Sequence, residues 1–303
     1  MSNTEFAQQL QQQTSGCKLN TYQMTTSRTM TPGQIQRVAE LFNAEKDSVG
    51  GKRAILNRKH ELIAPVYQAL RSARAFIQAN SIDYPERGLR LVKLSRIPYL
   101  QEKIGGYIEE LNEALRMLDA GWESVKEEAK GRLEELYMEE DYAIRPSQAF
   151  GIELTFPAIQ PDSRLMQLHP ELYQREQERI AARFSEALAN AEAAAVDTLQ
   201  TMIAHFIERL TPSEDGKKKS LSTSAIENIR EFVGNFRELS IGSNEQLEQL
   251  VDQVDQICEG IDIKAIRKAG PEDRGQVVDA MNELLSKIDQ IVIDRPIREL
   301  ELE

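Results

Sequence analysis

The sequence predicts a mainly α protein, and three observations lead to this fold class. Two long segments repeat apolar residues every three or four positions, a spacing that places them on one face of a helix. The 303 residues include only 16 glycines and 11 prolines, few for a protein built of sandwiches or barrels. Only one segment alternates apolar and polar residues clearly. We therefore expect an elongated antiparallel pair of long helices, a small two-stranded β element and a C-terminal helical bundle.

The first part of the chain predicts a polar arm followed by two helices. Residues 1–30 are rich in Gln, Thr and Ser, which favours a flexible arm. Thr31-Pro32 supplies an N-cap residue and a first-turn proline. The apolar stripe of this helix then consists of Ile35, Val38, Leu41 and Phe42. A second helix is expected over about 52–79, after the break at Gly50-Gly51.

Two long helices are expected in the middle of the chain. Residues 98–138 carry a seam like that of a coiled coil, and its members are Ile104, Ile108, Leu111, Leu115, Leu118, Trp122, Val125 and Ala129. This spacing places Trp122 in the core. The second long helix covers about 170–211, and its Ala-rich middle permits close approach of a partner helix. Because the two helices are nearly equal in length, we expect them to pack against each other.

The β element rests on one alternating segment. Residues 150–157 place Ile152, Leu154 and Phe156 on one side and Glu153 and Thr155 on the other. A lone strand leaves its backbone groups without partners. We therefore expect it to pair with residues 89–94, which follow a turn at 84–88.

The loop 212–223 is the predicted domain boundary. Helices follow at about 223–239, 244–259 and 271–293, each with its own apolar stripe. They close a small bundle or dock on the long pair. The predicted domains are an arm (1–30), a long-helix domain with the β element (31–211), a linker (212–223) and a C-terminal helical subdomain (224–303).

Composition and charge limit the compartment and the partners. The chain has 49 acidic and 37 basic residues, a net charge of −12, and this sign repels nucleic acid phosphates and anionic lipids. The N-terminus lacks the pattern of a signal peptide, and no apolar run approaches the roughly 20 residues of a membrane span. Cys17 and Cys258 are too few and too far apart for a disulfide framework. We expect a cytoplasmic protein.

No residue pattern typical of catalysis, metal binding or cofactor binding occurs in the sequence. His205 shares a helix face with Asp197 and Thr201, but no nucleophile or second histidine accompanies it. The acidic cluster 139–141 lacks the spacing of a calcium loop. Gly50-Gly51-Lys52 lacks the first glycine and the following Ser or Thr of a phosphate-binding loop. We therefore expect no enzyme activity, no metal and no cofactor.

Two groups of residues are candidates for recognition. Tyr84, Arg87 and Arg90 lie at a turn between a helix and a strand and form a candidate recognition turn. Lys217, Lys218 and Lys219 form a candidate basic loop. Both groups are interpreted as solvated surface or as local contacts with an anion or nucleic acid.

Several stretches, in this order, resemble a family of proteins of unknown function from tailed phages and other mobile elements. The matching stretches are Arg71–Arg74, Tyr84–Leu91, Asp141-Tyr142, Phe150–Glu153, Ser224–Glu231 and Ile241–Glu248. The resemblance implies a phage or mobile-element origin, and hence the host cytoplasm. Some members are encoded near MoxR-like AAA+ ATPases, which implies such an ATPase as a partner. No site residues follow from it.

These observations lead to two hypotheses of function. The first is a non-enzymatic scaffold or adaptor that acts through protein–protein contacts, self-associates through its helical surfaces and serves an AAA+ partner. The second is an accessory protein of phage nucleic-acid transactions that contacts DNA or RNA through its basic patches. The sequence favours the first, since the chain is acidic and its helices carry wide apolar faces.

Overall fold

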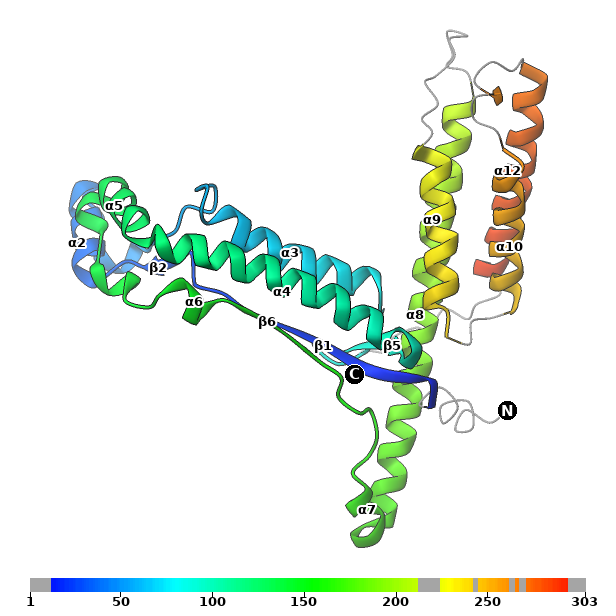
Figure 1. Ribbon diagram of the computed structural model, residues 1–303, viewed down its shortest axis with the longest axis horizontal. Helices are drawn as coiled ribbons and strands as arrows, with labels where there is room; N and C mark the ends of the chain where they lie inside the picture. Colours follow the sequence, from blue (N-terminus) through cyan, green and yellow to red (C-terminus); the bar gives the residue numbers. More distant parts are fainter. Residues whose placement is uncertain (1–11, 212–223, 242–244, 262–264, 267–270, 294–303) are drawn as a thin grey trace. The chain divides into compact units, whose positions relative to one another are not determined.

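The computed structural model describes residues 12–211, 224–241, 245–261, 265–266 and 271–293. They form two compact units (Figure 1). The first, named the bundle unit, comprises the described residues up to Gly16, then Asn80–Leu94 and those from Ala158 onward. The second, named the α3–α4 unit, comprises Cys17–Ala79 and Ser95–Pro157. The described structure is 70% helical, which confirms the prediction of a mainly α protein.

The α3–α4 unit contains helices α2 to α6 and four of the strands, wholly or in large part. Its elements are most of β1 (Thr14–Tyr22), β2 (Ser27–Thr29), α2 (Pro32–Leu41), η1 (Lys46–Ser48), β3 (Lys52–Ala54), α3 (Ala64–Ala79), most of η2 (Leu94–Arg96), α4 (Ile97–Ala120), α5 (Trp122–Leu133), η3 (Glu134–Leu136), η4 (Glu139–Tyr142), α6 (Pro146–Ala149) and β6 (Gly151–Thr155). Helix α3 packs along α4 (Figure 1). Leu70 of α3 and Leu111 of α4 belong to one buried core.

The long helix expected over 98–138 is divided in the structure. Helix α4 ends at Ala120 and α5 begins at Trp122. The residue between them is Gly121, where an added Cβ would overlap Leu62 Cδ1. The end of the Leu62 side chain therefore packs closely against Gly121 and would have to shift to admit a larger residue. Trp122 is 5% exposed within the core, which confirms its predicted position.

The β structure differs from the expected pairing. Residues 1–30, expected to be a flexible arm, contain β1 and β2. Strand β1 pairs antiparallel with β6, with Leu19 opposite Leu154, while β5 pairs antiparallel with β4. Direct pairing of 89–94 with 151–157 is therefore wrong. The sequence hides β1 because its alternation is carried by Cys17, Leu19 and Thr21, only two of which are apolar.

A second ladder corrects the predicted second helix. Residues 52–54, expected to begin a helix, instead form β3, which pairs antiparallel with β2. Arg28 lies opposite Arg53 in this ladder. Helix α3 begins only at Ala64. The buried side chains of α3 extend from Val66 to Ile77, so only the later part of the predicted segment is helical.

The bundle unit is organised around one helix of 41 residues, α8. Its elements are β4 (Ile82–Asp83), β5 (Arg90–Lys93), α7 (Ser163–Leu168), α8 (Pro170–Leu210), α9 (Ser224–Leu239), α10 (Glu245–Glu259) and α12 (Pro271–Ile293). The middle of α8 packs against β4, and its second half packs with α9 and α12 (Figure 1). Helix α10 contacts both α9 and α12. These four helices enclose a core that includes Phe206 and Leu250.

The predicted boundaries of the last four helices agree closely with the structure, while the predicted pairing of the long helices is not confirmed. Each long helix has helical partners in its own unit, α3 for α4 and α9 and α12 for α8. The predicted linker at 212–223 lies outside the described residues.

Candidate functional site

The candidate recognition turn is mostly built into the bundle unit. Tyr84 is only 5% exposed, and its ring lies 5.5 Å from that of Phe184 in an edge-to-face contact. Burial raises the pKa of the Tyr84 phenol, so the hydroxyl stays protonated at neutral pH. Tyr84 is therefore a core residue of the β4–β5 turn rather than an exposed platform.

The two arginines of the same turn have different roles. Arg90 Nε donates to Ser81 Oγ at 2.5 Å and Arg90 Nη2 donates to the Ser81 carbonyl at 2.9 Å. Arg90 also pairs with Asp83, so its guanidinium closes the strand pair. Arg87 is exposed, and the next residue, Gly88, adopts φ 76°, a conformation that glycine tolerates. The turn thus presents Arg87 to solvent and uses Tyr84 and Arg90 internally.

Two further basic residues near the turn are engaged within the chain, and the candidate basic loop lies elsewhere. Lys93 Nζ donates to the Arg237 carbonyl at 3.2 Å. The Arg96 guanidinium lies 4.7 Å from the ring centroid of Tyr99. Lys217, Lys218 and Lys219 lie outside the described residues. The structure therefore does not gather the predicted basic residues into one surface among the parts it describes.

A different surface occurs where α7 folds back against the start of α8 (Figure 1). The Asp162 carboxylate caps α7 by accepting from the Arg164 backbone N–H at 2.9 Å, and it also pairs with the Arg164 guanidinium. The Arg164 side chain and backbone hydrogen bonds lower the pKa of Asp162 to about 2. A charged N-cap at the positive end of the helix favours this short helix at neutral pH.

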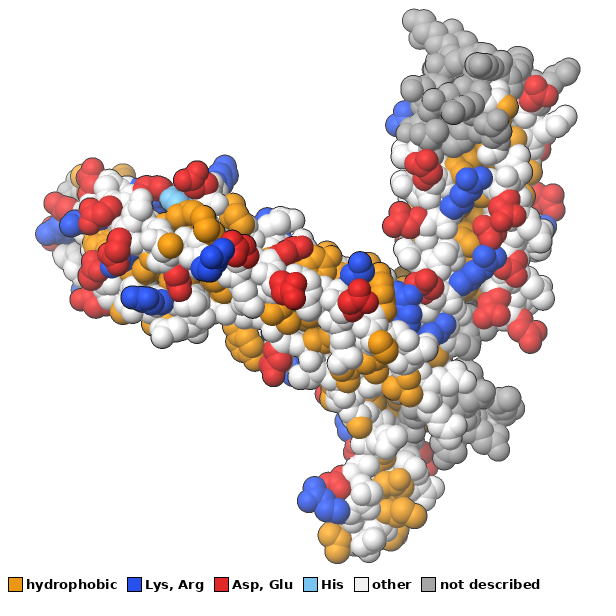
Figure 2. Space-filling view, viewed as in Figure 1, with side chains coloured by type: hydrophobic (Ala, Val, Ile, Leu, Met, Phe, Trp, Pro, Cys, Tyr) orange, Lys and Arg blue, Asp and Glu red, His pale blue; other side chains and the backbone are white. Residues whose placement is uncertain are grey.

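Three large apolar side chains are exposed at this hairpin. Met166 is 61% exposed, Leu168 is 72% exposed and Leu172 is 44% exposed. We name these three residues the α7–α8 surface. Figure 2 shows hydrophobic side chains gathered at the α7 end of the bundle unit. Single exposed leucines are common, but neighbouring ones at the tip of a hairpin are typical of an interaction site.

Helix α2 presents a second apolar end. Thr31 and Gln34 form a capping box that fixes its start. At its other end Leu41 is 76% exposed and Phe42 is 72% exposed. Both residues belong to the stripe that the sequence predicts, so the apolar stripe extends beyond the contacts that α2 makes within the chain.

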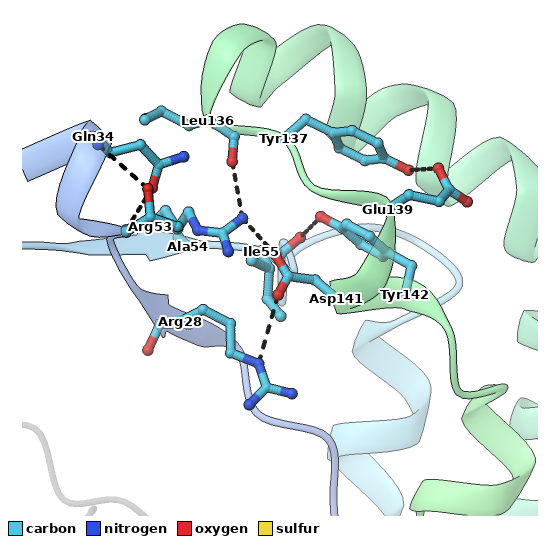
Figure 3. A network of polar contacts seen from close by, with 12 residues as sticks. Arg28, Gln34, Arg53, Ala54, Ile55, Leu136, Tyr137, Glu139, Asp141 and Tyr142 are labelled. Atoms are coloured by element: carbon cyan, nitrogen blue, oxygen red, sulfur yellow. Dashed lines mark hydrogen bonds and ion pairs between the residues drawn. The ribbon is translucent and has the colours of Figure 1, made fainter. Parts of the chain in front are cut away.

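A buried polar network ties the β2–β3 ladder to η3 and η4 (Figure 3). Arg53 Nη1 lies 2.5 Å from Asp141 Oδ2 and donates to the Leu136 carbonyl at 2.9 Å. Arg28 Nε lies 3.8 Å from Asp141 Oδ1. The Tyr142 hydroxyl donates to the Ile55 carbonyl at 2.7 Å. These contacts join the β2–β3 segment to residues more than 80 positions later in the chain, and they indicate a structural role.

The acidic cluster 139–141 is divided among cations and a phenol rather than gathered around one point. Asp141 faces the two arginines, while Glu139 accepts from the Tyr137 hydroxyl at 2.7 Å (Figure 3). Glu139 also lies 3.3 Å from Lys126 Nζ. Burial, followed by the Glu139 hydrogen bond, raises the pKa of Tyr137. A protonated phenol is a poor nucleophile. Within the described ranges, no three His, Cys, Asp or Glu residues form a group able to hold a metal ion.

Sequence reasoning missed the Arg53–Asp141 pair and helix α7. In the sequence Arg53 simply follows Gly50-Gly51-Lys52, and no neighbouring residue indicates that its side chain is buried. For α7 a signal was present, because Asp162-Ser163-Arg164 supplies an N-cap before Leu165 and Met166.

Comparison with known proteins found no match in protein-family models, in curated proteins or in solved structures. Over the described residues, no helix is both long enough and apolar enough to span a membrane.

Proposed function

We propose that the protein is a non-enzymatic helical scaffold or adaptor that binds other proteins through exposed apolar surfaces. The observation that carries this proposal is the α7–α8 surface, where Met166, Leu168 and Leu172 are exposed together. Covering such side chains with a complementary surface contributes roughly 25 cal/mol per Å² of apolar area removed from water. A protein surface of similar shape supplies that cover.

The charges around the α7–α8 surface support a protein partner. Arg164 pairs with Asp162, and Arg179 pairs with Glu176 on α8. Paired charges leave little net field at the hairpin, although the chain as a whole carries −12. An apolar centre with a charge-balanced rim is the usual anatomy of a protein–protein interface. The AAA+ ATPase partner and the phage origin implied by the resemblance remain part of this proposal.

Site-specific photo-crosslinking tests the proposal. A photoreactive residue at position 168 is expected to capture a defined protein in cells that express the chain. A photoreactive residue at Gln174, an exposed polar position on α8, serves as the matched control. Addition of Leu172→Asp should remove the crosslink from position 168. Equal crosslinking from both positions, or none from position 168, would contradict the proposal.

The alternative function, contact with nucleic acid, is tested separately by a gel shift at several salt concentrations. Phosphate contacts weaken steeply as salt rises. The scaffold proposal predicts no specific complex at physiological salt. A specific complex that is lost in Arg87→Ala would favour the nucleic-acid hypothesis instead.

A further inference from the structure

One face of α4 is exposed and carries an ordered pattern of residues. Tyr99 is 39% exposed and Met117 is 53% exposed, and Lys103, Gly106 and Glu110 between them are also exposed. Their spacings of three, four and seven residues place all five on one stripe of the helix. We name this stripe the α4 face. It lies beside the buried seam that contacts α3.

The α4 face contains Gly106, whose neighbour Gly105 lies about 100° away around the helix axis and outside the face. Gly105 and Gly106 lie inside a helix of 24 residues, where each glycine costs about 1 kcal/mol relative to alanine. A Cβ added at either position would meet nothing within 4 Å. Among the described residues, therefore, no contact of an added Cβ selects glycine here. Small residues at a helix surface allow a second helix to approach closely, because interaxial distance depends on the side chains at the contact.

The charges on the α4 face are complementary to themselves. Lys103 and Glu110 are seven residues apart, at equal distances from the point between Gly106 and Tyr107. Two turns separate them, roughly 10 Å along the axis, too far for an ion pair within the helix. In an antiparallel pair with its two-fold axis at this point, Lys103 of each copy lies opposite Glu110 of the other. Neither residue forms an ion pair with another residue that the structure describes.

The aromatic residues around the centre of the face are held in place by α3. The Phe76 ring lies 5.7 Å from that of Tyr99 and 5.9 Å from that of Tyr107. Lys103 Nζ lies 5.9 Å from the Tyr99 ring centroid. The same two-fold axis places Gly106 of each copy opposite Tyr107 of the other. Fixed aromatic side chains lose little conformational entropy when a partner binds.

We infer that the α4 face binds a second copy of this chain in an antiparallel, two-fold symmetric dimer. This inference deepens the proposed scaffold function and names the surface for self-association. A two-fold contact presents the same patch from both subunits, so each ion pair occurs twice. The exposed carboxylates of Glu102 and Glu109 flank the face on its other side and confine the contact to a narrow strip.

Sedimentation equilibrium of the full chain with exchanged charges tests the dimer. Lys103→Glu alone and Glu110→Lys alone each place like charges opposite one another, and each should weaken dimerisation at least tenfold. An equimolar mixture of the two variants should recover a dimer, because each Glu then faces a Lys. The double variant with both exchanges should dimerise like the wild type. The control is Lys59→Glu, which makes the same charge change in an exposed turn before α3. It should leave the mass unchanged.

A second variant tests the close approach. At the exposed position 106 an added Cβ meets nothing within 4 Å and leucine improves helix propensity, so Gly106→Leu should fold while its side chain blocks the partner helix. It should sediment as a monomer of 34.4 kDa with an undiminished melting temperature. A wild-type monomer at all concentrations, or a mixture of the charge variants that stays monomeric, would overturn the inference.

The crosslink from position 168 separates this result from the proposed function. If the α4 dimer fails while Leu168 still captures another protein, the scaffold proposal stands and the inference falls. If the charge exchange behaves as expected while position 168 captures nothing, the chain dimerises but the adaptor proposal falls.

Discussion

Removing Asp141 is expected to destabilise the α3–α4 unit strongly, because it leaves Arg53 buried without its counter-charge. The Arg53 side chain is 4% exposed and that of Asp141 is 10% exposed, with 2.5 Å between Nη1 and Oδ2. At an effective dielectric constant of about 20 the gross attraction is about 7 kcal/mol. The desolvation of both groups offsets much of it, and loss of one partner of a buried pair typically costs about 3–5 kcal/mol.

The structure places Asp141→Asn at the lower end of that range. The Leu136 carbonyl still accepts from Arg53 at 2.9 Å, and the Asn side-chain carbonyl is able to accept a further hydrogen bond. We therefore expect a loss of about 3 kcal/mol in the free energy of unfolding. Replacing both partners with apolar residues, Arg53→Met with Asp141→Leu, should recover much of it, since neither charge then needs desolvation.

Urea denaturation followed by tryptophan fluorescence measures this loss of stability in the α3–α4 unit. Trp122 is the single tryptophan, lies in the core of the α3–α4 unit, and has its ring 6.0 Å from that of Tyr142. The matched control is Glu135→Gln, which removes the exposed Arg37–Glu135 pair from the neighbouring η3 and should change stability far less. If Asp141→Asn loses no more stability than Glu135→Gln, the conclusion that the buried Arg53–Asp141 pair stabilises the α3–α4 unit is wrong.

Three further changes have defined outcomes. Tyr84→Ala should lower the free energy of unfolding of the bundle unit by about 3–5 kcal/mol, whereas Tyr84→Phe should change it by less than about 1.5 kcal/mol. Thermal circular dichroism measures both changes. Equal effects of the two variants would mean that the hydroxyl matters more than the packing of the ring. Asp162 has a folded pKa of about 2, below its unfolded value, so its contribution to α7 is complete above the unfolded pKa and is lost as pH falls through about 2. NMR shifts of α7 should follow this titration in the wild type and not in Asp162→Asn. Gly121→Ala should change the stability of the α3–α4 unit only slightly, because the end of the Leu62 side chain can shift away from the added Cβ; urea denaturation followed at Trp122 measures the change, and a large loss would mean that Leu62 is held rigidly.

The sequence predicts helices well here because helical burial repeats over many residues. The stripe of α8 extends from Ile180 to Leu210, and those of α9, α10 and α12 repeat over several turns each. Many positions agree on one period, so a single misplaced residue does not change the prediction. The division at Gly121 escaped prediction because the apolar seam continues through it, and the close contact with Leu62 appears only in the structure.

Strands and surfaces are harder to predict because they depend on partners distant in the sequence. Strand β1 pairs with β6 more than a hundred residues later, and its own side chains alternate weakly. Tyr84 resembles an exposed aromatic at a turn, yet its burial depends on Phe184 of α8. Buried ion pairs such as Arg53–Asp141 have no local pattern, since each residue alone is typical of a surface.

The length of α8 gives the α7–α8 surface its position. Ile180 is the first buried residue of α8, and the helix begins ten residues earlier at Pro170. Those residues extend the helix by roughly 15 Å beyond its core. An isolated extension of this length is marginally stable in water, because most helical stability comes from tertiary packing. The fold-back of α7, capped by Asp162, supplies packing for this extension while leaving Leu168 and Leu172 exposed. That arrangement adds no buried residue to α8 before Ile180, so the hairpin contributes little to the core. The apolar side chains that it exposes to a binding partner are therefore the better explanation for it.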